Sequence, residues 1–548
     1  MTSLPPQGAP PGADTLPKLI AHHARTRPTR PAMRHKRRGI WRTWTWAGQA
    51  TDVAAIARVL AEAGVATDAV VATLGDNRPE LYHAMLAAQC LGATALPIPA
   101  TADADRLAAV LAGHVPAVVV AETEEQADTV QRVARRAEPV VLRLAAPGAS
   151  ASSIPTLEER AARFRDTPAD WFAAKAAATR ADAVAVVLHS AGIQGKPRPV
   201  PLSHADLLSA ASTGAAALAL TPEDLALAFL PMDSVLDQGM LVVPALVAGH
   251  CVACAESPAT IATDLHDLAP TVIVAPPRAF ELIDRRIRRH LPVDRPLVRI
   301  ASALGAAGRR LLLSAPLLNA LGLRRLRVAV SVGDALGPGC AVRLRALGVP
   351  LRQGYGLAEA AGLVALERDE GGTMQPLPGV SVTTVDGQLR VRRDDGRWID
   401  TGDAASLTPD GGMTLLGRRD ARLAVGGHPL DPAAVEADLR GHDAIDRAFV
   451  QGDGSGRLAA LLVLDPDTVG RWAHRQGIAL AGGMTTGPVR DLAARLVEAT
   501  NAALHSRHGA DAIARFDIAT GRIDAALTPT GRLRRHLLAR AVPRGREA

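Results

Sequence analysis

The 548-residue sequence predicts an α/β protein, with a large N-terminal domain of parallel or mixed sheets covered by helices and a smaller α+β C-terminal domain. Short valine-rich segments alternate with longer helical patterns from Leu16 to Val330, an order typical of parallel strands joined by crossover helices. A second α/β pattern begins after a cluster of glycine and charged residues at Gly417–Asp420, which indicates a domain boundary. We therefore expect a disordered lead at residues 1–14, an N-terminal domain at 15–416 and a mobile C-terminal domain at 417–548.

The elements follow from apolar periodicity, in chain order. The expected helices of the N-terminal domain are Leu16–Arg27, Ala47–Ala63 and Glu80–Leu91. The expected strands are Arg42–Trp46, Ala69–Leu74, Ala93–Ile98, Ala117–Ala121, Val184–Leu188, Leu225–Leu230, Val272–Ala275 and Arg327–Val330. After Ala365 the pattern changes to a small β-region, with a hairpin at Gly379–Arg392 that turns at Asp386-Gly387. The C-terminal domain is predicted to contain helices Pro432–Arg440 and Val489–His505 and the strand Leu458–Leu464.

Composition favours a protein of a reducing compartment. Four cysteines are few for this length, and Cys251 and Cys254 lie in an apolar run, so we expect buried structural thiols rather than a metal or redox pair. No stretch of about 20 apolar residues is present, and the first residues lack the pattern of a signal peptide. We expect a cytoplasmic protein. A peripheral contact of this protein with a membrane surface is an alternative that the sequence does not decide.

The net charge of +7 raises the question of nucleic-acid binding. The positive charge is almost wholly arginine spread along the chain, and the single dense run, Arg34–Thr43, is better explained as a solvated edge than as a phosphate or membrane contact. We therefore expect no nucleic-acid partner.

One loop points to phosphate chemistry. The apolar run Ala183–Leu188 is followed by Ser190–His204, which contains two glycines, three prolines and the cations Lys196 and Arg198, and a helix is expected to open at Ser203. A strand, a glycine-bearing loop and a helix direct backbone N–H groups at a phosphate. A surface turn is the alternative explanation of this loop taken alone.

Three further motifs follow in the chain. They are Leu230–Ser234, Gln353–Glu359 preceded by Ser331–Leu336, and Asp400–Asp403 followed by Gly417–Asp420. In their order and spacing, the four stretches resemble the adenylate-forming superfamily of acyl-CoA synthetases, adenylation domains and luciferases. Several other stretches resemble its long-chain fatty acyl-CoA synthetase branch: Asp14–Pro17, Gly39–Trp41, Gly75–Glu80, Ala275–Glu281 and Leu527–Arg535.

This resemblance implies a ligase that uses ATP and Mg²⁺ to convert a fatty acid to an acyl-adenylate and then to acyl-CoA, with CoA as co-substrate. Joining a carboxylate to a phosphate brings two anions together, so the site must neutralise charge and fix geometry. The resemblance implies the catalytic residues Glu359, which would also hold Mg²⁺, Arg198 and Arg532. It implies nucleotide-binding residues at Ser190, Gly192, Gln194, Gly195, Lys196, Gly333, Asp334, Gln353, Gly354, Tyr355, Gly356, Asp403 and Arg418. It places Ser234 and Ala358 in the acyl pocket and the hinge between the domains at Asp420.

The sequence departs from the family pattern at positions expected to take part in the reaction. The positions at which its residue type differs from that pattern are Ala191, Ile193, Gln194, Arg198, Pro199, Ser234, Ala358 and Arg532. Arginine at position 532 keeps the positive charge of the family's lysine but has a longer, planar head. Two hypotheses follow, an active fatty acid–CoA ligase or an impaired homologue that binds nucleotide or acyl-adenylate without efficient adenylation. A basic protein that uses this fold as a scaffold on nucleic acid or a membrane surface is a third.

Overall fold

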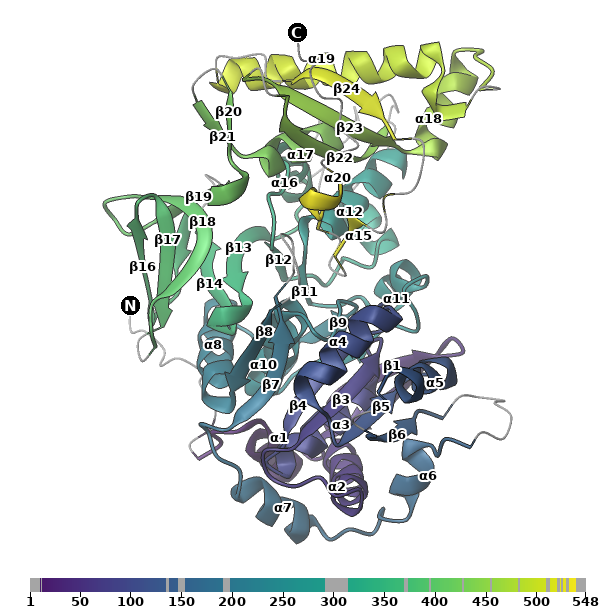
Figure 1. Cartoon of the computed structure of the whole chain (residues 1–548), viewed down its shortest axis with the longest axis vertical. Coiled ribbons are helices and arrows are strands. Elements are labelled where there is room, and N and C mark those ends of the chain that lie inside the picture. The colour runs from purple at the N-terminus through teal and green to yellow at the C-terminus, as the bar shows by residue number, and fades with distance from the viewer. Residues whose placement is uncertain are drawn as a thin grey trace.

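The computed structural model describes the greater part of the chain. The described residues are 10, 12–134, 138–145, 153–190, 198–290, 314–368, 373–393, 396–425, 428–453, 456–480, 483–508, 513–519, 523, 526–528 and 532–538. Within them the large domain is built on two sheets, and the C-terminal domain lies at one end of it (Figure 1). No helix in this part of the chain combines the length and the apolar character needed to cross a membrane.

The first sheet has six strands in the order β6-β5-β3-β4-β7-β8, and all neighbours are parallel except β7 and β8. Its strands are β3 (Val70–Gly75), β4 (Thr94–Pro99), β5 (Val118–Ala121), β6 (Val140–Arg143), β7 (Val184–His189) and β8 (Pro199–Ser203). The helices in this part of the chain are α1 (Leu16–Thr26), α2 (Trp46–Glu62), α3 (Pro79–Cys90), α4 (Ala104–His114), α5 (Glu124–Val133), α6 (Leu157–Ala162), α7 (Ala169–Ala177) and α8 (His204–Ala217). Side-chain caps from Thr15, Thr45 and Ser203 define where α1, α2 and α8 begin.

The second sheet has thirteen strands in the order β16-β17-β18-β19-β15-β14-β13-β12-β11-β9-β10-β1-β2. Its strands are β1 (Pro31–Arg37), β2 (Ile40–Thr45), β9 (Leu225–Ala228), β10 (Cys251–Cys254), β11 (Val272–Ala275), β12 (Val328–Val332), β13 (Leu351–Leu357), β14 (Gly362–Glu367), β15 (Met374–Pro376), β16 (Val380–Val385), β17 (Gln388–Arg393), β18 (Ile399–Leu407) and β19 (Met413–Arg418). The central strands from β1 to β13 are parallel, and the strands beyond β13 are antiparallel. The helical elements are α9 (Val235–Asp237), the π-helix η1 (Gln238–Val242), α10 (Val243–Ala248), α11 (Ile261–Leu268), α12 (Pro277–His290), α15 (Ala315–Ala320), α16 (Pro338–Ala346) and the short 3₁₀ turns η3 (Ala358–Ala360) and η4 (Arg419–Ala421).

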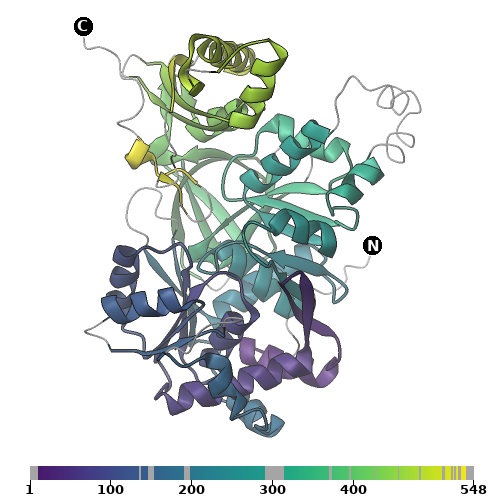
Figure 2. The same ribbon diagram turned by 90° about the vertical axis from the view of Figure 1, so that its right-hand side faces the viewer.

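The C-terminal domain has its own apolar core, which gathers residues from Val425 to Ile518. Its elements are β20 (Leu423–Val425), β21 (His428–Leu430), α17 (Pro432–Arg440), β22 (Ile445–Gly452), β23 (Leu458–Leu464), α18 (Pro466–Arg475), η5 (Gly483–Thr485), α19 (Gly487–His508), β24 (Ile513–Ile518) and α20 (Arg535–Leu538). Figure 2 shows this domain above the large domain, with α20 in yellow beside the boundary between them.

The structure confirms the expected α/β class and most expected elements. The strand Leu458–Leu464 and the helix Pro432–Arg440 have the predicted bounds. The β16–β17 hairpin turns at Asp386 and Gly387, whose φ angles of 49° and 73° are those of a type I′ turn. The cysteine expectation is also confirmed, because Cys251 and Cys254 are free, buried and on opposite faces of β10, in two different core clusters.

Two sequence expectations were wrong in part. Helix α8 begins where the sequence predicts, with Ser203 as its N-cap and His204 as its first residue, but residues 199–203, which were assigned to the loop, form β8. This strand pairs antiparallel with β7, so the loop between β7 and β8 closes a hairpin. The start of α8 therefore does not directly follow the glycine-bearing loop. The basic run forms the β1–β2 hairpin at an edge of the sheet, as expected, but it is not solvated throughout. Lys36 is buried between Asp264 and Asp267, at Nζ–Oδ distances of 3.0 and 2.5 Å. These partners are more than 200 positions away and leave no local sequence signal.

Candidate active site

A cleft of about 1070 Å³ lies where the large domain faces the C-terminal domain. Its walls come from the ends of β7, β12 and β13, from β18 and β19, and from the segment before α20. The carboxyl ends of parallel strands are where open α/β sheets bind ligands. The cleft contains nearly all of the described site residues that the sequence predicts: Ser190, Arg198, Ser234, Gly333, Asp334, Gln353, Gly354, Tyr355, Gly356, Ala358, Glu359, Asp403, Arg418 and Arg532.

A polar triad on three strands forms one wall. Tyr355 of β13 donates its hydroxyl proton to Asp403 Oδ2 at 2.6 Å, and Arg418 Nη1 lies 3.4 Å from Asp403 Oδ1. Asp403 and Arg418 are cross-strand partners on β18 and β19, so sheet register places their side chains together. Burial of Tyr355, together with the Asp403 carboxylate, raises its pKa well above the ordinary tyrosine value. The triad thus presents a neutral phenol ring beside a fixed carboxylate.

Glu359 supplies an exposed carboxylate in the same cleft. It stands on the short turn η3, directly after β13, and its side chain is exposed. A carboxylate that projects into a cleft in this way is a suitable ligand for a hard cation. Ala358, its neighbour, is buried and adds only a methyl group to the wall.

Arg532 enters the cleft from the C-terminal domain. Its Nε lies 3.8 Å from Asp334 Oδ2, after β12 of the large domain. The segment that carries it is held locally, because Thr528 N donates to Arg532 O at 2.7 Å and Arg532 N donates to Thr528 Oγ1 at 3.0 Å. The arginine is 28% exposed, so its charge is available to a ligand in the cleft.

Arg535 anchors the same segment to the core of the C-terminal domain. It donates to both carboxylate oxygens of Glu436 at 2.8 Å and to the backbone carbonyl of Val450 at 2.9 Å. Burial raises the pKa of Glu436 to about 7, and Arg535 opposes that rise. This ion pair was not predicted from the sequence, since any of several arginines near the C-terminus could have filled the position.

Only the two ends of the glycine-bearing loop are described. Ser190 Oγ accepts a hydrogen bond from Arg198 N at 2.9 Å, and Ser190 N donates to Arg198 O at 2.9 Å, which closes the β7–β8 hairpin. The Arg198 side chain is exposed at the cleft. The remaining predicted loop residues lie outside the described residues: Gly192, Gln194, Gly195 and Lys196, with Ala191 and Ile193.

Ser234 lines the cleft, but its hydroxyl is engaged by the backbone. Ser234 Oγ donates to Pro231 O at 2.7 Å and accepts from Asp237 N at 3.2 Å, as the N-cap of α9. A serine in this state holds the start of α9 rather than offering a free hydroxyl to a ligand. Ser234 therefore lies at the cleft, as predicted, but its hydroxyl oxygen caps α9.

Gly356 is required by packing inside the protein. A Cβ atom at this position would stand 2.2 Å from Cε of Met240 and 2.5 Å from the carbonyl oxygen of Gly362. Met240 belongs to η1 and lines the cleft, where it lies against β13. The sequence indicated Gly356 but not Met240, because an apolar residue in an apolar run carries no signal of its own.

A buried acidic network that reaches the cleft wall at Asp233 and Arg106 was also missed. Asp237 is fully buried and accepts hydrogen bonds from Tyr82 Oη at 2.8 Å, Asn77 Nδ2 at 3.1 Å and Gln238 Nε2 at 2.9 Å. Nearby, Asp233 pairs with Arg106 Nη2 of α4 at 2.9 Å. Burial raises the pKa of Asp237 to about 8 and that of Asp233 to about 6, although these donors oppose the rise. The only sign of this network in the sequence is the pair of acidic residues, Asp233 and Asp237, within an apolar run.

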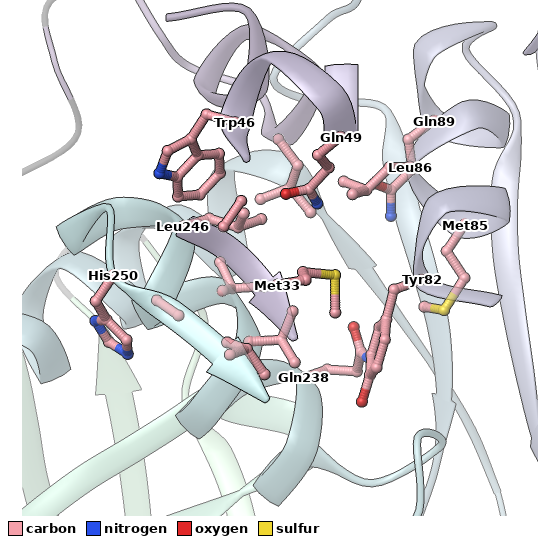
Figure 3. Close-up of a pocket in the computed structure, with 16 residues that line it drawn as sticks. Met33, Trp46, Gln49, Tyr82, Met85, Leu86, Gln89, Gln238, Leu246 and His250 are labelled. Carbon is pink, nitrogen blue, oxygen red and sulfur yellow. The ribbon is translucent and has the colours of Figure 1, made fainter. Parts of the chain in front are cut away.

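A second, smaller cavity of about 30 Å³ lies behind this network. Figure 3 shows it between Gln49 of α2, Tyr82 of α3 and Gln238 of η1, with Met33 of β1 beside it. This volume is that of about two water molecules. The cavity is too small for a nucleotide, so the cleft is the candidate active site.

The Asp237→Asn variant is expected to be more stable than the native protein, by a margin that grows with pH. The pKa of Asp237 is about 8 in the folded protein, against the ordinary aspartate value of 3.8, so folding favours the protonated acid. The native protein therefore loses stability as pH rises from about 4 to 8, by up to roughly 1.4 kcal/mol per pH unit. Asparagine is neutral throughout, and rotation of the Gln238 amide can offer it an acceptor.

Chemical denaturation of both proteins at pH 5, 6.5 and 8 measures this difference in the free energy of unfolding. Asp517→Asn, at an exposed position, is the matched control and should track the native protein. A difference between Asp237→Asn and the native protein that does not change with pH would contradict a protonated Asp237.

The fold and the cleft together define a class, that of two-domain α/β enzymes whose site lies between a large domain and a small C-terminal domain. The chain belongs to the AMP-binding enzyme family, whose model matches residues 20–397. Among curated proteins it is 28% identical to the long-chain-fatty-acid–CoA ligase FadD15 of Mycobacterium bovis, over 96% of this chain and 95% of that protein. It is 24% identical to a feruloyl-CoA synthase of Amycolatopsis, over 78% of this chain and 84% of that protein.

Solved structures show the same fold. The anthranilate CoA ligase AuaEII, in complex with anthranoyl-AMP, matches with a TM-score of 0.76 at 17% identity, over 96% of this chain and 97% of that one. The adenylation domain of a carboxylate reductase from Mycobacterium chelonae matches with a TM-score of 0.75 at 19% identity, over 97% of this chain and 90% of that one. Both matches cover the C-terminal domain as well as the large domain.

Proposed function

We propose that this protein is an ATP-dependent acyl-CoA synthetase that activates a fatty acid through an acyl-adenylate. The observation that carries the proposal is the meeting, in one cleft, of Arg532 with Glu359 and with the triad of Tyr355, Asp403 and Arg418. These groups come from separate parts of the chain, and together they offer a nucleotide surface, a carboxylate for a cation and a cation for the reacting anions. The match to a fatty acid–CoA ligase over nearly the whole chain supports the acyl substrate.

In the proposed first step, the fatty acid carboxylate attacks the α-phosphate of ATP, a P–O bond to the acyl oxygen forms, and pyrophosphate leaves with the bonding electron pair. Tyr355 would lie against the adenine and Asp403 would accept hydrogen bonds from the ribose. Arg532 would neutralise charge between the carboxylate and the α-phosphate, since preorganised cations stabilise charge that develops in the transition state. Arg198 and the loop that it closes would hold the departing phosphates.

The described residues fit a magnesium ion. No group of three metal-ligating side chains occurs in the part of the chain that the structure describes. Magnesium is commonly held by one or two carboxylates together with substrate phosphates, so the single exposed carboxylate of Glu359 matches that need. The ion would neutralise phosphate charge.

In the proposed second step, the thiol of CoA attacks the acyl carbon, a C–S bond forms, and AMP leaves. We propose Asp420 as the hinge about which the C-terminal domain, from Gly417 onward, changes orientation between the steps. Asp420 is exposed on η4, and its Oδ1 lies 3.6 Å from Arg418 Nε, so it connects the triad to the segment between the domains. The four cysteines are buried and free, which supports the proposal that the protein functions in a reducing compartment such as the cytoplasm. No nucleic-acid partner is proposed.

An ATP–pyrophosphate exchange assay with a panel of fatty acids of increasing length tests this function. We expect exchange that depends on both the acid and Mg²⁺, and formation of acyl-CoA when CoA is added. The contrary result is nucleotide binding by calorimetry without exchange for any acid, which would establish the impaired homologue instead. That alternative has one specific observation in its favour, since the hydroxyls of Ser190 and Ser234 are both engaged by the backbone.

A further inference from the structure

Helix α12 of the large domain makes a set of ion pairs with the C-terminal domain. Arg278 pairs with Asp446, the second residue of β22, and also donates to its backbone carbonyl at 3.0 Å. Arg285, only 4% exposed, lies 3.0 Å from Asp446 Oδ1 and 3.3 Å from Asp465 Oδ2. It also donates to the carbonyl of Ile445 at 2.9 Å. One carboxylate of the C-terminal domain thus receives two arginines of the same helix.

Two more pairs extend this contact along α12. Arg440, at the end of α17, donates through Nε and Nη2 to both oxygens of Glu281 at 3.0–3.1 Å. Arg288 pairs with Asp443 and donates to the carbonyl of Gly441 at 3.4 Å. We use the name α12 clasp for the α12 residues Arg278, Glu281, Arg285 and Arg288 with their partners Arg440, Asp443, Asp446 and Asp465.

The helix that carries the clasp is fixed to the large domain. Phe280 and Ile287 of α12 are buried in the core beside β11 and β12. Asp284 pairs with Arg343 of α16 at 2.7 Å. The three clasp arginines on α12 therefore cannot follow the C-terminal domain if it turns. A change of domain orientation has to break the clasp.

The clasp differs from an ordinary surface contact because its charges are largely buried. Exposed ion pairs contribute little to stability, and boundaries between domains usually permit motion. Here Arg285, Glu281 and Arg440 are mostly shielded from water, and the Arg440–Glu281 pair is bidentate. Removing one partner of such a pair leaves a buried charge without compensation, which is costly.

We propose that the α12 clasp holds the C-terminal domain in the orientation that presents Arg532 to the cleft, and so favours adenylation over thioester formation. The clasp residues are positioning residues, because they act through Arg532 and need no contact with the substrates. The kinetic part of this inference rests on the proposed function. The structural part, that the clasp fixes domain orientation without a ligand, does not.

Distance measurements between two spin labels test the structural part. The four native cysteines are buried, so labels can be directed to Val342→Cys on α16 and Asp467→Cys on α18, both exposed positions. The ligand-free protein is expected to give one narrow distance distribution. Removing three of the four clasp carboxylates with Glu281→Gln, Asp443→Asn and Asp446→Asn together, here called clasp neutralisation, should broaden this distribution or add a second distance. An unchanged distribution would overturn the inference.

The two half-reactions, measured separately, test the kinetic part. The rate of pyrophosphate exchange should fall roughly tenfold in the Glu281→Gln/Asp443→Asn/Asp446→Asn protein, because fewer molecules hold the adenylating orientation. Transfer of a synthetic acyl-adenylate to CoA should be unchanged or faster. A loss of folding would lower both rates equally.

The matched control is Asp517→Asn, which removes an exposed carboxylate that pairs with Arg490 inside the C-terminal domain. It should leave the label distance and both rates as they are in the native protein. Equal slowing of the two half-reactions by clasp neutralisation, with a normal melting temperature, would overturn the positioning role. If the native protein catalyses neither half-reaction, the proposed function fails, and the label distances still decide whether the clasp sets the orientation.

Discussion

Replacing Arg532 by alanine is expected to slow ATP–pyrophosphate exchange about 100- to 1,000-fold, the usual cost of removing one preorganised group that stabilises transition-state charge. Arg532 enters the cleft from the C-terminal domain and is opposed there by Asp334 at 3.8 Å. Without the arginine, the Asp334 carboxylate would add to the repulsion between the fatty acid and the α-phosphate. The transfer of a synthetic acyl-adenylate to CoA should change little.

Two further variants make this prediction specific. Arg475→Ala removes an exposed arginine on α18 of the same domain and should behave as the native protein does. Arg532→Lys keeps the charge on a more compact head, and we expect it to support exchange at least as well as the native arginine. Exchange by Arg532→Ala at the rate of the Arg475→Ala control would show that the cleft adenylates without this cation.

The Glu359→Gln variant is expected to lose about 100-fold in exchange rate, with a higher requirement for Mg²⁺. Glutamine has nearly the same shape as glutamate but binds a hard cation more weakly, because it lacks the negative charge. The side chain is exposed on η3, so folding should not depend on it. The measurement is the exchange rate as a function of Mg²⁺ concentration for the variant and the native protein.

Glu125→Gln, an exposed glutamate on α5, is the control for the removal of one negative charge. It should leave both the rate and the Mg²⁺ dependence unchanged. If Glu359→Gln shows the native Mg²⁺ dependence, the ion is held elsewhere, and the assignment of this carboxylate is wrong.

The agreement between sequence and structure is closest where a signal is local. Val70–Gly75 and Leu458–Leu464 are short β-branched or aliphatic runs, and a buried strand is the only element that fits their length and flanks. The motifs Gln353–Glu359 and Asp400–Asp403 were recognised because each is contiguous. The structure places both motifs in one cleft, the first at the end of β13 and on η3, the second within β18.

The expectations that failed depended on pairing partners outside the short segments from which they were made. Residues 199–203, assigned to the glycine-bearing loop, form β8 at the sheet edge beside β7, although α8 opens where the sequence predicts. The basic run contains a buried lysine because Asp264 and Asp267 of α11 come to meet Lys36. A pattern read over a few residues carries no record of such contacts.

The sequence by itself determined the α/β class, with its smaller C-terminal domain, and the family, because apolar periodicity and contiguous motifs are properties of short segments. Only the tertiary structure decided the surroundings of individual groups: that Ser234 caps α9, that burial raises the pKa of Asp237 to about 8, and that Met240 packs against Gly356. It alone also revealed the α12 clasp and the position of Arg532 at the cleft. Burial and hydrogen-bond partners set the charge of a side chain and what it can bind, and both are supplied by residues distant in sequence.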